Sequence, residues 1–172
     1  MAGPHFERVL LIVGDPNTGK STQLRSMFLD PRLGGAIPTS RNISDTYQLS
    51  PGRSLYLRLT SPHEARESLS EFLQKIVSRA RSGRWCVAAP IQVTATPIMP
   101  APPAVVAAVH ARLKPERIRV CLLSPDYHGN HLPDASKMTT ALRRTSVCEV
   151  FAIDARDRQR NGLLLADTFD FA

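Results

Sequence analysis

The 172-residue sequence predicts an α/β fold, a three-layer α-β-α arrangement in which helices cover both faces of a mostly parallel sheet. Apolar, β-branched runs alternate along the chain with amphipathic segments, which is typical of strands joined by crossover helices. The strand runs are apolar throughout, as in sheets that are buried on both faces. A Pro-Gly pair between two short runs predicts one antiparallel hairpin at an edge of the sheet. We therefore expect a single domain over residues 1–172, with residues 160–172 as its C-terminal tail.

The first strand is expected over residues 8–13, because this apolar run leads directly into Gly14. A helix should follow, since apolar side chains recur at helical spacing until Asp30-Pro31 stops the pattern. The next stretch, residues 34–44, is polar and Gly-rich and is expected to be a loop.

The hairpin is expected to pair residues 46–49 with residues 54–59 around Pro51-Gly52. The next helix is expected to open with Ser61-Pro62-His63-Glu64. Serine is a good N-cap, proline suits the first helical position, and Glu64 would complete a capping box. Apolar residues then recur at three- and four-residue spacing and predict the clearest amphipathic helix of the chain: Ala65, Leu69, Phe72, Leu73, Ile76, Val77 and Ala80.

The second half of the chain continues the alternation of strands and helices. Short apolar runs predict strands over residues 85–89, 118–123 and 147–153. Residues 90–103 carry five prolines and are expected to form an irregular loop. One helix should end before Pro115, and a shorter one should be capped by Asp134.

The segment Gly14-Asp15-Pro16-Asn17-Thr18-Gly19-Lys20-Ser21 matches G-x-x-x-x-G-K-[ST], the phosphate-binding P-loop, and lies between an expected strand and an expected helix. Its two glycines allow backbone dihedrals that turn successive N–H groups toward an anion. Lys20 supplies a positive charge for the β and γ phosphates, and the Ser21 hydroxyl is a ligand for the magnesium ion that they carry.

On this motif, which covers only about the first thirty residues, the chain resembles the P-loop NTPase superfamily. The resemblance implies binding of ATP or GTP with magnesium, and it implies that Lys20 acts in catalysis. The nucleotide-binding residues that follow from it are Gly14, Asp15, Pro16, Asn17, Thr18, Gly19, Lys20, Ser21 and Thr22.

The order of expected elements along the chain is similar to that of small GTPases. That family carries a magnesium-holding D-x-x-G motif after its third strand and a guanine-specifying N-K-x-D motif. Here the corresponding stretches are Leu59-Thr60-Ser61-Pro62-His63-Glu64 and Ser124-Pro125-Asp126, which match neither motif. The choice between adenine and guanine stays open, with ATP preferred as the commoner nucleotide.

A P-loop site also needs an acidic residue after an apolar strand to order magnesium. Asp154 is the first choice because the apolar run of residues 150–153 leads straight into it, so the expected metal residues are Ser21 and Asp154. Asp126 and Glu64 are the alternatives. Each carboxylate also has an ordinary structural role open to it, at a strand end, in a turn or in a capping box.

Three functions compete. A slow NTP hydrolase or nucleotide-dependent switch needs mostly positioning and charge neutralisation, which Lys20, Ser21 and an arginine such as Arg41 could supply. A non-enzymatic nucleotide-binding interaction module agrees with the missing motifs; residues 163–172 would then dock on a protein partner, or pack on the chain's own sheet. A small-molecule kinase would use the proline-rich loop and the arginine clusters as an acceptor site. We rank the three in this order.

Charge and composition limit the classes of binding partner that we expect. The formal net charge is +7, and clustered arginines allow contact with nucleic acid, but no aromatic residues interleave them and charge alone carries no sequence specificity. A protein partner has more support than nucleic acid. The three cysteines lie in apolar runs and are expected to be buried and reduced. No apolar stretch reaches the ~18 residues of a membrane span and no signal-peptide pattern is present, so we expect a cytoplasmic protein without a membrane partner.

Overall fold

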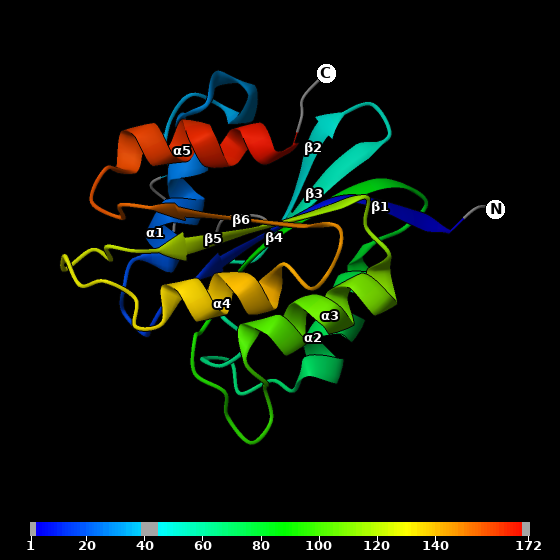
Figure 1. Ribbon diagram of the computed structural model, residues 1–172. Coiled ribbons are helices and arrows are strands. Elements are labelled where there is room, and N and C mark those ends of the chain that lie inside the picture. The colour runs from blue at the N-terminus through cyan, green and yellow to red at the C-terminus, as the bar shows by residue number, and fades with distance from the viewer. Residues whose placement is uncertain (1–2, 39–44, 170–172) are drawn as a thin grey trace.

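The computed structural model describes residues 3–38 and 45–169, and these residues form one six-stranded sheet with helices on both faces (Figure 1). The strands are β1 (Pro4–Val13), β2 (Thr46–Ser50), β3 (Arg53–Leu57), β4 (Gly83–Ile91), β5 (Arg117–Leu123) and β6 (Cys148–Ile153). The α-helices are α1 (Lys20–Ser26), α2 (Leu69–Arg79), α3 (Pro102–Leu113), α4 (Ala135–Leu142) and α5 (Arg158–Ala166). Short 3₁₀ helices cover Met27–Leu29, Pro31–Leu33 and Asp167–Phe169.

The strand order is β2-β3-β4-β1-β5-β6, and every neighbouring pair is parallel except β2 and β3. The prediction of an α/β fold with one antiparallel hairpin at a sheet edge is therefore confirmed. Strand β1 lies in the middle, with β4 on one side and β5 on the other. Because parallel strands end at the same edge of a sheet, the loops after β1, β4 and β5 meet at one place.

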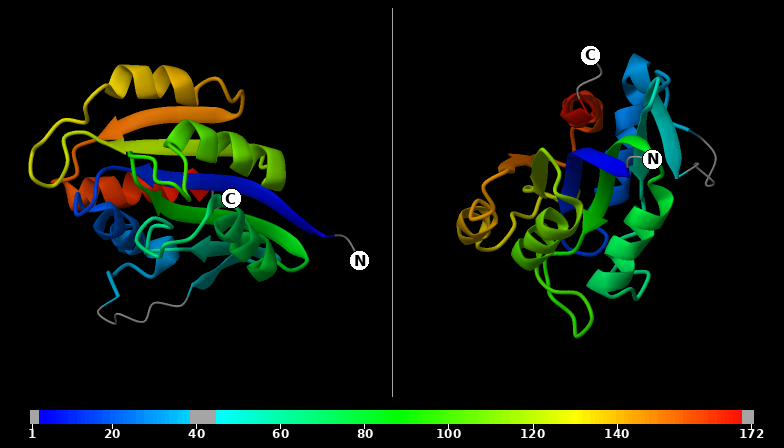
Figure 2. Two further views of the ribbon diagram at one scale, coloured as in Figure 1. Left: turned by 90° about the horizontal axis from the view of Figure 1, so that it is seen from below. Right: turned by 90° about the vertical axis from the view of Figure 1, so that its right-hand side faces the viewer.

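Two apolar cores fill the space between the sheet and its two helix layers. Helices α1 and α5 cover one face, and α2, α3 and α4 cover the other (Figures 1 and 2). Alternate residues of β1 serve the two cores, as the period of a strand requires: Leu10 and Ile12 face the α1/α5 layer, and Val9, Leu11 and Val13 face the opposite layer. The three cysteines, Cys86, Cys121 and Cys148, are free and buried, as expected.

The expected start of the second α-helix was wrong. The Ser61–Glu64 capping box does form, with the Glu64 N–H donating to Ser61 Oγ and the Ser61 N–H donating to the Glu64 carboxylate, both at 3.2 Å. It closes only a short turn, because Arg66 adopts the left-handed conformation (φ 53°) and interrupts the helical backbone. Helix α2 starts at Leu69, after a second capping box made by Ser68 and Glu71.

The proline-rich loop is shorter than expected. Strand β4 runs through Pro90 to Ile91, and α3 already begins at Pro102. A proline is tolerated there because β3 ends at Leu57, opposite Ala88, so no neighbouring strand on that side needs the missing N–H.

The C-terminal tail packs on the chain's own sheet, one of the two alternatives left open by the sequence. Leu165, Ala166 and Phe169 are fully buried in the α1/α5 core. Residues 170–172 lie outside the described part of the chain, as does Arg41, the arginine considered above as a charge stabiliser.

A buried ion pair holds this tail to the sheet. Glu7 of β1 and Arg53 of β3 are 1% and 4% exposed, and the Arg53 guanidinium donates to the Glu7 carboxylate and to the Phe169 carbonyl. The same carboxylate pairs with Arg84 of β4, whose side chain is 62% exposed. One carboxylate therefore links three strands and the C-terminal segment, a connection that no local sequence pattern predicts.

Replacing Arg53 should show how much this link contributes. Arg53→Met leaves the Glu7 charge buried without its inner partner, so we expect the free energy of unfolding to fall by about 3–5 kcal/mol. Arg84→Met removes an exposed partner of the same carboxylate and should cost less than about 1 kcal/mol. Urea denaturation measures both, and an Arg53 variant as stable as the Arg84 variant would contradict the assignment.

Gly162 of α5 gives a second stability test. A Cβ atom at this position would lie 2.1 Å from the Ser26 carbonyl oxygen, so α5 and α1 could not stay in contact as they are. Alanine usually stabilises a helix relative to glycine, yet here overpacking should lower the free energy of unfolding by about 1–3 kcal/mol. The control is Gly3→Ala, where an added Cβ meets no atom within 4 Å. A neutral or stabilising Gly162→Ala would show that the two helices do not pack this closely.

Candidate functional site

The turn that joins β1 to α1, residues 14–21, needs glycine at two positions and is called the 14–21 loop below. A Cβ on Gly14 would lie 2.7 Å from Thr18 Oγ1, closer than van der Waals contact allows. Gly19 has φ 96°, a value that residues with side chains rarely adopt. Asn17 is also left-handed, at φ 60°, and asparagine is among the residues that tolerate this conformation best. The loop is thus fixed by its own residue types.

Lys20 folds back over this loop. Its side chain is buried, and Nζ donates to the Asp15 carbonyl at 2.5 Å, which also accepts from Thr18 Oγ1 at 2.7 Å. Burial lowers the pKa of Lys20, and the carboxylates of Glu64 and Asp15 partly oppose this shift. The ammonium group is therefore largely desolvated and makes its short contact with a neutral carbonyl.

Ser21 connects the loop to a distant segment of the chain. Its Oγ donates to the carbonyl of Leu59 at 2.5 Å. Leu59 begins the stretch that follows β3, residues 59–64, called the 59–64 segment below. Strand β3 is separated from β1 by β4, so the 59–64 segment crosses the end of β4 to reach the loop.

A pocket of about 270 Å³ opens between these two segments, lined by Asn17, Thr18, Gly19, Lys20, Ser21, Thr22 and Glu64. Six of the nine residues expected to bind nucleotide line it. The other three, Gly14, Asp15 and Pro16, do not line the pocket. Asp15 contributes the carbonyl that accepts the hydrogen bond of Lys20. Glu64 supplies the carboxylate of the pocket and is exposed to solvent.

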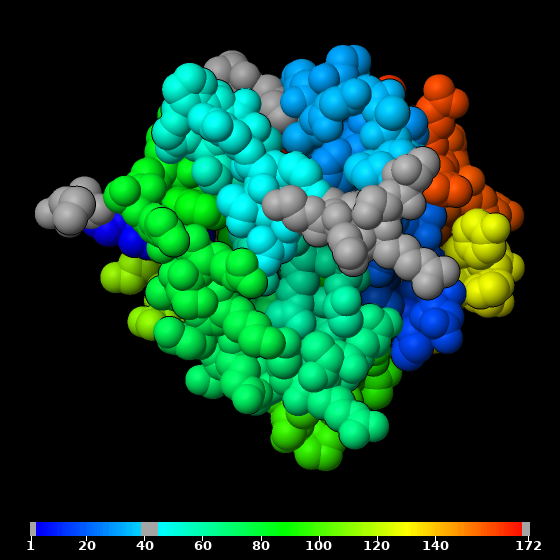
Figure 3. Space-filling view, turned by 180° about the vertical axis from the view of Figure 1, so that it is seen from behind, coloured from blue at the N-terminus to red at the C-terminus, as the bar shows by residue number. Residues whose placement is uncertain are grey.

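The loop after β5, residues 124–131, packs against the other side of the 14–21 loop (Figure 3). The Tyr127 N–H donates to the Thr18 carbonyl at 3.3 Å. A Cβ on Gly19 would lie 3.4 Å from Tyr127 Cβ, in ordinary van der Waals contact. Tyr127 was not predicted as a site residue, although an aromatic residue just past an expected strand was a signal available in the sequence.

Asp126, an alternative magnesium carboxylate, folds its own loop. Its Oδ1 accepts from the backbone N–H of His128 at 2.8 Å and of Asn130 at 2.9 Å. These hydrogen bonds outweigh the effect of burial and lower the pKa of the carboxyl. Asp126 therefore acts here as a turn residue.

Asp154, the first choice for the magnesium carboxylate, lies after β6 at the far edge of the sheet, with β5 between β6 and β1. Its carboxylate accepts from the Arg156 N–H at 3.0 Å and from the Arg156 guanidinium at 2.6 and 2.8 Å. These contacts lower the pKa of Asp154 to about 2. Asp154 is not among the residues that line the pocket of Ser21, so the structure does not bring the two expected metal residues together in that pocket. The metal role of Asp154 stays a prediction.

A larger cavity, of about 620 Å³, lies between β3 and α2 and shares Leu59 and Thr60 with the 59–64 segment. Its charged side chains are paired. Glu67 contacts Arg58 at 2.6 Å and also contacts Lys75. Arg79 contacts Asp45 at 2.9 Å, which uses the Asp45 carboxylate in an ion pair. The cavity is thus polar, but each of its charged side chains already contacts a side chain of opposite charge.

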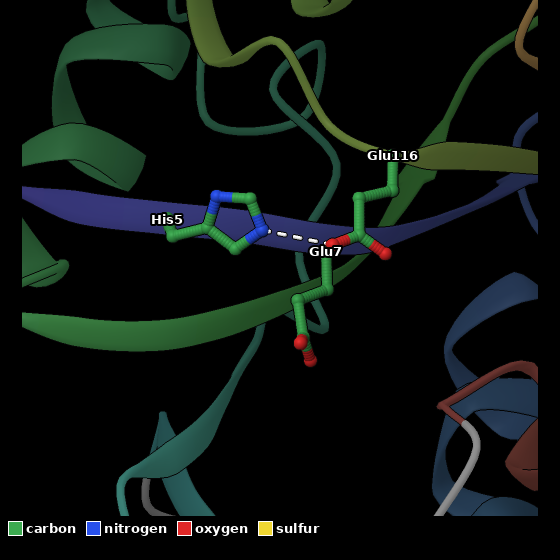
Figure 4. A group of neighbouring side chains, drawn as sticks. All are labelled: His5, Glu7 and Glu116. Carbon is green, nitrogen blue, oxygen red and sulfur yellow. Dashed lines mark hydrogen bonds and ion pairs between the residues drawn. The ribbon is translucent and has the colours of Figure 1, made fainter.

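A histidine and two carboxylates, His5, Glu7 and Glu116, gather near the start of β1, at the end opposite to Gly14 (Figure 4). His5 Nε2 is 2.9 Å from Glu116 Oε1, and Arg8 contacts the other oxygen of Glu116 at 2.8 Å. A Glu7 carboxylate oxygen lies within 4.8 Å of this pair, no hydrogen bond joins them in Figure 4, and the carboxylate contacts the two arginines described above. Cations already neutralise both carboxylates, so the group is a network of ion pairs.

Within residues 3–38 and 45–169, no helix is long and apolar enough to cross a membrane. Comparison of the chain with protein-family models, with curated proteins and with solved structures found no match.

Proposed function

We propose that this chain is a P-loop protein that binds a nucleoside triphosphate with magnesium in the pocket of the 14–21 loop and acts as a slow hydrolase or nucleotide-dependent switch. One observation carries the proposal: the buried side chain of Lys20 lines a pocket formed by the second half of a complete G-x-x-x-x-G-K-S sequence. A phosphate is the ligand that suits a desolvated lysine, and the backbone N–H groups of a Gly-rich turn before a helix can bind the same anion.

In the proposed complex, the side chains of Lys20 and Ser21 exchange their present carbonyl partners for the ligand. Lys20 exchanges a neutral carbonyl for phosphate oxygens, and an ammonium group binds a negatively charged acceptor more strongly than a neutral one. A magnesium ion held by Ser21 would neutralise phosphate charge during transfer. When the Ser21 hydroxyl turns toward that ion, the Leu59 carbonyl loses its donor. The 59–64 segment then changes its contacts with nucleotide state, which is the element that a switch needs.

Slow turnover follows from the placement of the carboxylates. Asp126 is hydrogen-bonded within its own loop and Asp154 is held by Arg156. Glu64 lines the pocket, but one of its oxygens accepts the Ser61 N–H of the capping box. Among these three candidates the geometry favours Glu64 as the group that orders the attacking water or the ion, and its second duty limits how well it is positioned.

Calorimetry with MgATP and MgGTP tests the binding site. We expect Lys20→Ala to weaken binding of either nucleotide by at least tenfold, because a charge-assisted contact with phosphate contributes about 1.5–3 kcal/mol. The matched control is Lys137→Ala, which removes a lysine with an 83% exposed side chain that pairs with Asp134. The wild-type protein showing no heat with both nucleotides, or the Lys20 variant binding as well as the control, would refute the site.

The rate of phosphate release from a bound nucleoside triphosphate tests whether Glu64 or Asp154 is the functional carboxylate. The wild-type protein alone should turn over more slowly than ~1 s⁻¹, below the range of dedicated kinases. Glu64→Gln should reduce this rate by about 10²-fold, as expected for loss of a group that orders or deprotonates water, with little change in nucleotide affinity. Asp154→Asn should leave the rate unchanged. The reverse pattern would restore Asp154 as the functional carboxylate, and no turnover by the wild type would favour the non-enzymatic binding module.

A further inference from the structure

Tyr127 has an exposed aromatic ring, whereas its backbone and Cβ atom are in contact with the 14–21 loop. It is 55% exposed, whereas its backbone N–H donates to Thr18 and its Cβ lies against Gly19. Both contacts are with residues that line the pocket of the 14–21 loop. The N–H and Cβ of Tyr127 therefore lie next to two residues that line this pocket, and these contacts leave the faces of the ring unused.

The loop that carries Tyr127 is braced by its own hydrogen bonds. In addition to the contacts of the Asp126 carboxylate, the Asp126 N–H donates to the Asn130 carbonyl at 2.8 Å and the Gly129 N–H donates to the Asp126 carbonyl at 3.0 Å. Ser124 Oγ accepts the Leu132 N–H at 3.0 Å. The Tyr127 ring also makes an edge contact with His128, with centroids 5.7 Å apart. A ring held this way loses little conformational freedom when a ligand packs on it.

We propose that Tyr127 is the platform on which the base of the bound nucleotide stacks, and that the site takes ATP and GTP with similar affinity. The inference rests on the proposed function, since it requires the triphosphate to lie in the pocket of the 14–21 loop. Ribose and base would then leave this pocket past Gly19, which lies beside the Cβ atom of Tyr127. Stacking on an aromatic ring tolerates any base, because every base has a π face.

The loop does not offer the group that would select guanine. A carboxylate recognises guanine by accepting hydrogen bonds from its N–H groups, and Asp126 is the acidic residue of the 124–131 loop. Its Oδ1 already accepts two backbone N–H groups, and its Oδ2 lies 3.5 Å from Asn130 Nδ2. Since reading guanine would require this turn to open, the ring alone holds the base.

The test compares nucleotides with a ligand that has no base. MgATP, MgGTP and magnesium tripolyphosphate are titrated calorimetrically into the wild-type protein and into the Tyr127→Ala and Tyr127→Phe variants. We expect Tyr127→Ala to weaken both nucleotides by about 5- to 150-fold, the range found for loss of one stacked base, and to leave tripolyphosphate unchanged. Tyr127→Phe keeps the ring and should bind like the wild type.

Each other outcome has a definite meaning. If Tyr127→Ala weakens tripolyphosphate as much as ATP, the side chain supports the 14–21 loop and the stacking role is wrong. If the variant binds all ligands like the wild type, stacking is also wrong, and Tyr127 serves another contact. A wild-type preference above tenfold between ATP and GTP overturns the lack of base selectivity. If the wild type binds none of the three ligands, the proposed function fails and the inference fails with it.

Discussion

The position of β1 is the constraint on which the site depends. This strand is paired with β4 along its length and with β5 over its C-terminal half, and its side chains are buried in both cores. The turn after this strand is therefore flanked by the ends of β4 and β5 and makes hydrogen bonds toward both. The Gly14 N–H accordingly donates to the Ile91 carbonyl at the end of β4. The loop after β5 then completes the surroundings of Gly19.

The hydrogen bond between Ser21 and Leu59 is what brings the far side of the sheet to this turn. Strand β4 separates β3 from β1, so this hydrogen bond joins two segments that follow non-adjacent strands. Glu64, in the segment after β3, lines the pocket of the 14–21 loop. The same segment also forms a wall of the larger cavity, where Arg58 and Glu67 pair. A change in the hydrogen bond of the Ser21 hydroxyl would therefore act on a segment that also borders this cavity beside α2.

The local parts of this arrangement were predictable from the sequence, whereas its long-range parts were not. The strand before Gly14 and the edge hairpin follow from residue patterns within a few positions, and both are confirmed. The start of α2 was wrong because two capping boxes follow one another, and the left-handed Arg66 between them keeps the first one from opening a long helix. Asp154 has the local pattern of a metal-binding carboxylate, but its distance along the sheet from the 14–21 loop depends on strand order, which is not a local property.

The charges of this chain separate into two kinds, and the difference bears on function. Glu7 lies within contact of two guanidinium groups, and Asp154 is held by Arg156, so exchanging these partners for a ligand would expose or bury an uncompensated charge. Lys20 and Ser21 instead make their short contacts with backbone carbonyls. A hydrogen bond to an uncharged carbonyl is given up at lower cost than an ion pair, especially when a contact with a charged ligand replaces it. Lys20 and Ser21, the groups that a phosphate and its magnesium ion would use, are thus easier to release from their present partners than Glu7 or Asp154.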